Sequence, residues 1–209
     1  MRHIFLVWLM AGSLLVSCSS RLSVREAFYP GTYPADLAVV TRQQWGWQPL
    51  KQKPAEQRIE KITIHHGGVE FKEDQDVALY LKNLQAWSRA EKNWPDMPYH
   101  FMIDLQGNIF EGRPLQFPGN TNTDYDVNGH AQICVLGNYE EQVIVPEQLE
   151  SLIALTAFLA AKYEVPLSAI KGHKDHTETL CPGKDLYRYL EDGTIYQQVR
   201  QRLKEQAIN

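Results

Sequence analysis

Short apolar runs alternate along this chain with long segments of helical periodicity, and this alternation limits the folds that the chain can adopt. Apolar residues at positions 59, 62 and 64 predict a strand over Arg58–His65. Apolar spacings of three and four predict a helix over Asp74–Trp94, with Asp74 as its N-cap. Strands interspersed with helices favour an α/β domain, built on one central mixed β-sheet flanked by helices.

The remaining elements follow the same two patterns. A turn at Gln106–Gly107 predicts a strand hairpin, and Pro146 suits the first turn of a second long helix. The further predicted elements are strands at Tyr99–Leu105, Asn108–Gly112, Ile133–Leu136 and Ile170–Gly172, and helices that begin at Pro146 and Ile195. We expect a single domain over residues 38–209, which is long enough to bury a proper core.

The N-terminal residues indicate an export signal rather than part of the fold. Ile4–Val16 carries no formal charge and is shorter than the roughly 20 residues that a membrane-spanning helix needs. The run ends in LVSC at Leu15–Cys18, which resembles the lipobox of bacterial lipoproteins, whose cysteine is acylated. We therefore expect a signal peptide over residues 1–17 and a lipidated tether over residues 18–37. The alternative is a plain signal peptide cut nearby, with Cys18 unmodified.

The residue after Cys18 bears on where the protein is held. Ser19 follows the cysteine rather than Asp, which in Gram-negative lipoproteins directs export to the outer membrane. Several acyl chains on one residue hold a protein on a membrane surface, where a single chain does not. The expected location is the bacterial cell envelope, with the protein lipid-anchored in the outer membrane and facing the periplasm.

Charge and cysteine content exclude two classes of protein. There are 21 Lys and Arg residues against 25 Asp and Glu residues, with no basic run, which argues against a nucleic-acid partner. Three cysteines in 209 residues exclude a disulfide-stapled scaffold. We expect a monomer.

Two histidine-bearing segments indicate metal chemistry. His65 and His66 close the first apolar strand and run into two glycines, which places a ring at the end of the sheet beside an open loop. His173 and Cys181 lie eight residues apart around a polar loop. Two imidazoles and a thiolate suit Zn²⁺, and three protein ligands leave a fourth position for water, as in catalytic zinc sites. The spacing alone leaves this open, because it is not that of a standard zinc finger.

Five motifs occur in one order over about residues 38–190. They are VTRQQWGW at Val40–Trp47, IHHG at Ile64–Gly67, PYHF at Pro98–Phe101 with GNIFEGR at Gly107–Arg113, ICVLGNY at Ile133–Tyr139, and the segment Gly172–Gly183. In this order the motifs resemble the zinc-dependent N-acetylmuramoyl-L-alanine amidases of the peptidoglycan-recognition-protein and T7-lysozyme type (amidase type 2). The resemblance implies a mixed sheet flanked by helices, with Zn²⁺ at one end of a groove that binds the peptidoglycan stem peptide.

The resemblance also implies roles for individual residues. One Zn²⁺ per chain would be bound by His65, His173 and Cys181. Tyr99 matches the catalytic tyrosine, whose hydroxyl faces the reacting water and the scissile carbonyl. Thr179 matches a position near the developing oxyanion. Hydrogen-bond donors at that point stabilise the negative charge of the tetrahedral oxygen.

Other positions carry weaker expectations. His66 matches a position that is usually a non-ligating histidine, so packing or a hydrogen bond is favoured over a substrate contact. Glu111 and Arg113 either stabilise the hairpin loop or contact the substrate. The roles of four more residues stay open, namely His130, Asp175, His176 and Glu178.

The chain departs from the family pattern on one strand. Gln132 stands where the family usually has glycine. Cys134 stands where a related intracellular branch has a glutamate general base, which favours the tyrosine-type mechanism and leaves Cys134 as a buried apolar residue. A disulfide between Cys134 and Cys181 is the alternative in an oxidising compartment.

The expected activity is hydrolysis of the amide between N-acetylmuramic acid and the L-alanine of the stem peptide, in cell-wall turnover or remodelling. The substrate would be intact peptidoglycan or released muropeptides. The alternative is a non-catalytic peptidoglycan-binding module. Such receptors typically lack the cysteine ligand, so Cys181 favours an enzyme.

Overall fold

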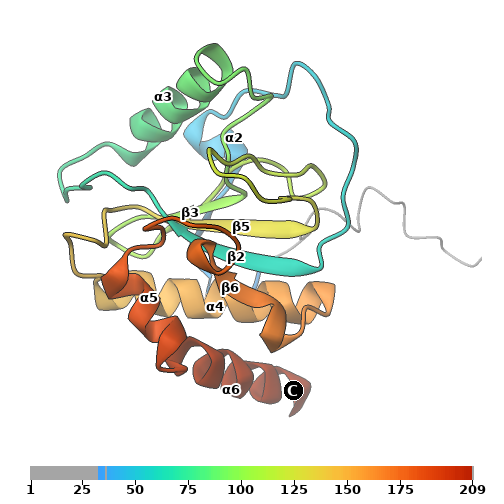
Figure 1. Cartoon of the computed structure of the whole chain (residues 1–209), viewed down its shortest axis with the longest axis vertical. Coiled ribbons are helices and arrows are strands. Elements are labelled where there is room, and N and C mark those ends of the chain that lie inside the picture. The colour runs from blue at the N-terminus through green and yellow to red at the C-terminus, as the bar shows by residue number, and fades with distance from the viewer. Residues whose placement is uncertain (1–32, 36, 209) are drawn as a thin grey trace, which may run out of the picture.

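One six-stranded mixed sheet forms the centre of the protein, in the order β1-β4-β3-β5-β2-β6 (Figure 1). The computed structural model describes residues 33–35 and 37–208. The strands are β1 (Val39–Val40), β2 (Lys61–His66), β3 (Phe101–Ile103), β4 (Ile109–Glu111), β5 (His130–Val135) and β6 (Ile170–Gly172). Only β3 and β4 pair antiparallel, as a hairpin, and the other neighbouring strands are parallel. The expected α/β fold with a mixed sheet is confirmed.

Helices lie on both sides of this sheet (Figure 1). They are α2 (Arg42–Trp45), α3 (Val77–Ala90), α4 (Pro146–Tyr163), α5 (Lys184–Glu191) and α6 (Thr194–Ile208), with short 3-10 turns at Leu167–Ala169 and His173–Asp175. The long helix α4 packs against β5, β2 and β3, and α6 packs against α4. The helices α2 and α3 lie on the opposite side of the sheet (Figure 1).

The two faces of the central strands carry different side chains, because successive residues of a strand point to opposite faces. Ile64 and Ile133 are buried in the apolar core beneath α4. His65 and Cys134, which the register of β2 and β5 pairs, lie on the other face. The sheet therefore presents its functional groups on the face away from α4.

The start of α3 differs from the sequence prediction. Its N-cap is Asp76 rather than Asp74, because the Asp76 side chain accepts a hydrogen bond from the N–H of Leu79 at 3.0 Å. The helix ends at Ala90, four residues before the predicted end at Trp94.

The folded part of the chain also begins earlier than residue 38. Tyr33 donates a hydrogen bond to Oε1 of Glu111 at 2.6 Å, and Leu37 is buried in the main core. Both residues were expected in the tether. The predicted signal peptide and Cys18 lie outside the described residues. Among the helices that the structure describes, none is long and apolar enough to span a membrane.

Candidate metal centre and active-site pocket

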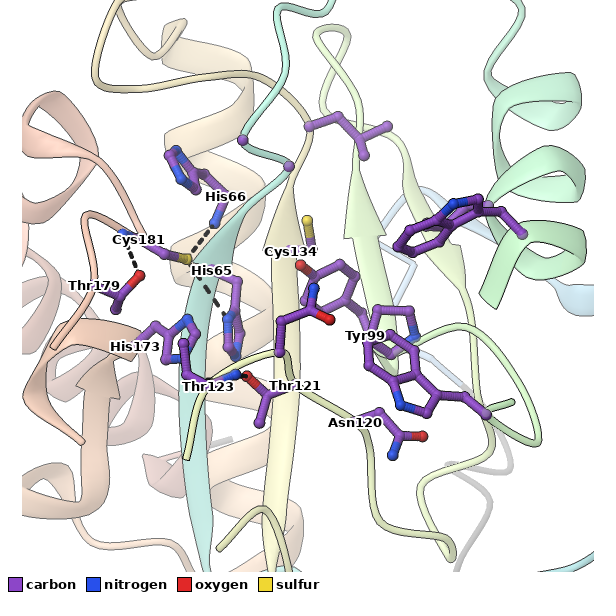
Figure 2. Close-up of a pocket in the computed structure, with 18 of the residues that line it drawn as sticks. His65, His66, Tyr99, Asn120, Thr121, Thr123, Cys134, His173, Thr179 and Cys181 are labelled. Atoms are coloured by element: carbon purple, nitrogen blue, oxygen red, sulfur yellow. Dashed lines mark hydrogen bonds between the residues drawn. The ribbon is translucent and has the colours of Figure 1, made fainter. Parts of the chain in front are cut away.

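The pairing of β2 with β6 brings the two predicted histidine ligands together. Both strands run in the same direction, and Ile64 is paired with Gly172. His65 and His173 each follow directly, so their rings meet at the same edge of the sheet, with centroids 4.6 Å apart. Figure 2 shows both rings beside Cys181, which arrives from the loop after the turn at His173–Asp175.

The three side chains could hold one metal ion. One ligand atom from each of His65, His173 and Cys181 lies within 4.8 Å of the other two. Nδ1 of His65 is 3.7 Å from Sγ of Cys181. A tetrahedral zinc, with a Zn–S bond of about 2.3 Å and a Zn–N bond of about 2.0 Å, places two such atoms roughly 3.5 Å apart. The donor set and its spacing fit zinc, and three ligands leave one position free.

Burial sets the protonation of these donors. It lowers the pKa of His65 well below its usual value of 6.5, and the neighbouring His173 lowers it further. Burial also lowers the pKa of His173 to about 4, so both rings are neutral at pH 7 and offer a lone pair. Burial raises the pKa of the Cys181 thiol to about 12. A bound cation would deprotonate this thiol, since a coordinating thiol loses its proton outright.

Neighbouring groups orient the donors. The hydroxyl of Thr123 is 2.7 Å from Nε2 of His173, which leaves Nδ1 of that ring for a metal. The backbone N–H of His66 donates to Sγ of Cys181 at 3.4 Å, and this hydrogen bond favours the thiolate. Oγ1 of Thr179 accepts the N–H of Cys181 at 3.2 Å. Each of these contacts fixes one ligand in place.

Tyr99 lies on the other side of His65, with ring centroids 5.2 Å apart. It comes from the segment just before β3, and Figure 2 shows it beside Cys134. Burial holds the pKa of Tyr99 well above its usual value of 10. The Tyr99 hydroxyl therefore keeps its proton at neutral pH and is available as a hydrogen-bond donor.

These residues line one open pocket with a volume of about 290 Å³. Tyr80, Leu84, Trp87 and Trp94 give it an apolar wall, and the loop Asn120–Thr123 gives it a polar one. Neither wall was predicted from the sequence. Trp87 is 43% exposed, whereas its neighbour Ser88 is buried on α3.

Two of the weaker expectations now have a structural context. His66 lines the pocket, and its Nδ1 accepts the N–H of Tyr139 at 3.2 Å, which fits a supporting role. Arg113 is 1% exposed and is not among the pocket residues. Its guanidinium donates to the backbone carbonyls of Met97 and Asp96 at 2.9 and 2.7 Å. Arg113 therefore ties the segment after β4 to the segment before β3, away from the hairpin turn itself.

The four residues whose roles the sequence left open either form hydrogen bonds near the candidate metal centre or lie at the surface. His130 and His176 both contact the hydroxyl of Thr63, at 2.7 and 3.1 Å. Asp175 accepts the N–H of Gly172 at 2.8 Å and so shapes the turn that carries His173. None of the four residues lines the pocket, namely His130, Asp175, His176 and Glu178. Glu178 is exposed.

The cysteines of the described chain are both free thiols. Cys134 is buried in the smaller apolar cluster, as expected, and Cys181 is half-buried. The structure therefore does not form the alternative disulfide between them.

Two neutral imidazoles and a thiol in an open pocket, beside a protonated tyrosine, form a candidate site for a single metal ion, with one coordination position left over. Comparison with known proteins shows the family to which the chain belongs. The Amidase_2 family, described as N-acetylmuramoyl-L-alanine amidase, matches residues 55–184, and the chain belongs to this family. Its members' properties support peptidoglycan binding or amidase activity for this protein.

Individual relatives are similar over most of the chain. Peptidoglycan recognition protein 1 of Bos indicus is 27% identical over 165 residues, which cover 78% of this chain and 87% of that protein. The N-acetylmuramoyl-L-alanine amidase of Sus scrofa is 26% identical over 165 residues, covering 73% of this chain but only 27% of that longer protein.

Solved structures share the fold. Drosophila peptidoglycan recognition protein SD superposes with a TM-score of 0.67 at 23% identity, covering 75% of this chain and 94% of that one. The amidase LysC of Clostridium intestinale superposes with a TM-score of 0.59 at 24% identity, covering 73% and 97%. At this level of identity the likeness shows the fold alone.

Proposed function

We propose that this protein is a zinc-dependent peptidoglycan amidase, which hydrolyses the amide between N-acetylmuramic acid and the L-alanine of the stem peptide. The observation that carries the proposal is the convergence of His65, His173 and Cys181 at the pocket that also holds Tyr99 and Thr179. Family membership supports either peptidoglycan binding or catalysis. The complete donor set favours catalysis, because a recognition module needs no metal donors.

The chemistry divides between the metal and the protein. Bound zinc supplies a Lewis acid and lowers the pKa of its water to about 7. Tyr99 keeps its proton and donates a hydrogen bond to the carbonyl oxygen as negative charge develops there. Oγ1 of Thr179 accepts the N–H of Cys181, so the Thr179 proton is free to point into the pocket as a second donor.

The two walls of the pocket suit a peptide-bearing substrate. The amide and hydroxyl groups of Asn120–Thr123 can exchange hydrogen bonds with peptide groups, whereas Trp87 and Trp94 offer apolar surface. We propose peptidoglycan or its muropeptides as the substrate, in turnover or remodelling of the cell wall.

Cleavage and binding can be separated in one experiment on isolated peptidoglycan sacculi. Zinc-loaded protein is incubated with sacculi, and both cosedimentation and the release of soluble peptides are measured. An amidase releases peptides, stops when a chelator removes the metal, and recovers when Zn²⁺ is returned. Zinc-loaded protein that cosediments without releasing peptide contradicts the proposal and identifies a binding module.

We also propose that Cys18 is lipidated and holds the protein at the outer membrane, facing the periplasm. This proposal rests on the sequence alone, on the apolar run Ile4–Val16 and the LVSC ending. The full chain, produced in a Gram-negative host, is expected to incorporate a palmitate analogue, and the Cys18→Ala variant is not. Equal labelling of the two chains would refute the anchor.

A further inference from the structure

We propose that Gln132 is a positioning residue for the metal ligand His65. Its amide oxygen accepts the Nε2–H of the His65 ring, directly or through one buried water. The inference deepens the proposed function, since it concerns the metal centre on which that function rests.

Several buried side-chain atoms have no hydrogen-bond partner among the described residues. They include Nε2 of His65 and both amide atoms of Gln132. His65 is 2% exposed and Gln132 is 0% exposed. A buried polar group that is left unsatisfied costs about 1–3 kcal/mol, and folded proteins pair the large majority of such groups. Both side chains therefore need a partner that lies within the protein.

The register of the sheet places these two side chains on one face of neighbouring strands. On β2 and β5, Thr63 is paired with Gln132, and His65 is paired with Cys134. Gln132 therefore lies one diagonal step from His65. Such diagonal neighbours are roughly 7–8 Å apart at their backbones, a distance that long side chains can span.

The ring nitrogens of His65 point in different directions. Nδ1 faces Sγ of Cys181 at 3.7 Å (Figure 2). Cys181 approaches from the side of β6, whereas β5 lies on the opposite side of β2. Nε2 therefore points away from the thiol and toward the part of the face that Gln132 occupies.

The side-chain amide of Gln132 packs closely against Gly119. A Cβ atom added at Gly119 would lie 2.7 Å from Nε2 of Gln132 and 2.8 Å from its Cδ. The glycine thus leaves room for the amide next to the loop Asn120–Thr123. In that loop Thr123 already contacts Nε2 of His173. With Gln132 as the partner of His65, both histidines have a polar side chain at Nε2, namely Gln132 for His65 and Thr123 for His173.

This pairing selects the tautomer that binds metal. A metal-ligating histidine donates its other ring N–H to an acceptor, which fixes the ring and its lone pair. An amide oxygen can accept only when Nε2 of His65 carries the proton. The lone pair is then on Nδ1, the nitrogen that faces Cys181.

The test measures zinc affinity by competition with a chromophoric chelator. Gln132→Met keeps the side-chain volume and removes the acceptor, and we expect the dissociation constant for Zn²⁺ to rise about 10–100-fold. Gln132→Glu keeps an acceptor and should bind zinc at least as tightly as the wild type. The matched control is Thr156→Val on α4, which also replaces a buried side-chain oxygen that has no partner among the described residues, away from the metal. Its zinc affinity should not change.

A Gln132→Met variant with wild-type zinc affinity would overturn the proposal. A second measurement needs no variant. In the zinc-loaded wild-type protein, NMR should detect a His65 Nε2–H that exchanges slowly with water, and rapid exchange would overturn the proposal equally. Because zinc binding is read without substrate, a protein that shows these effects and cleaves nothing would refute the proposed activity alone.

Discussion

Ile64 on β2 is paired with Gly172 on β6, and this pairing decides where the metal donors meet. His65 follows Ile64 in the sequence, and His173 follows Gly172. A register shift of one residue between the strands would move one of the rings to the other face of the sheet. The candidate metal centre therefore depends on the pairing of two parallel strands that lie more than a hundred residues apart in the sequence.

Replacement of Cys181 by alanine should abolish both zinc binding and hydrolysis. The loss of a direct ligand should exceed the roughly 10–100-fold loss in affinity that follows removal of an outer partner. The fold should persist, because Cys181 is only half-buried. Zinc affinity and circular dichroism measure the two effects. Cys134→Ala is the control and should keep its zinc, and a Cys181→Ala protein with full activity would disprove the ligand assignment.

Replacement of Tyr99 by phenylalanine should lower kcat by about 10²–10³, the usual effect of removing one donor to an oxyanion. KM and zinc affinity should stay near their wild-type values, because the ring and the metal donors are unchanged. Tyr80→Phe, in the same pocket, is the matched control and should retain its kcat. Steady-state kinetics on one muropeptide measure kcat and KM for each variant. A Tyr99→Phe enzyme as fast as the wild type would exclude a catalytic hydroxyl.

The contact between Thr123 and His173 should contribute to metal affinity. Thr123→Val keeps the shape of the side chain and removes the hydroxyl, so zinc should bind about 10–100-fold more weakly. Thr123→Ser retains the hydroxyl and should bind zinc like the wild type. Equal affinities of the valine and serine variants would show that the hydroxyl does not orient His173.

Acid should destabilise the metal-free protein through its buried histidines. Burial lowers the pKa of His130 to about 4 and that of His100 to about 3. The unfolded chain, with histidine pKa values near 6.5, therefore binds more protons below that pH, and stability falls as pH falls from about 6.5 toward 4. At pH 5 each buried histidine should cost about 2 kcal/mol of unfolding free energy. Urea unfolding at pH 7.5 and pH 5 measures this, and equal free energies would contradict it.

Sequence patterns were sufficient for the elements whose periodicity is regular. The strand at His65 and the helix from Pro146 follow clean apolar spacing. The helix begins at the predicted residue, and the strand begins at Lys61, three residues later than predicted. The start of β5 was missed, because His130 and Gln132 are polar residues buried on the functional face, which hides the apolar alternation. Local spacing also could not choose between Asp74 and Asp76 as the cap of α3.

The three candidate metal donors that the sequence predicts lie together in the structure, but the pocket around them was not predicted. The donors are of unusual residue types at strand and loop ends, so they carry a chemical signal. The walls come from α3, from Trp94 beyond its end, and from the loop Asn120–Thr123. These segments are distant in the sequence, and only tertiary packing brings them to one cavity.

The most direct test of the account uses a defined N-acetylmuramoyl peptide, incubated with the zinc-loaded protein and analysed by mass spectrometry. A parallel sample contains a chelator. We expect free peptide that begins at L-alanine, and we expect this product to disappear with the chelator and to return when Zn²⁺ is added. Intact substrate in the presence of protein with bound zinc would contradict the amidase activity.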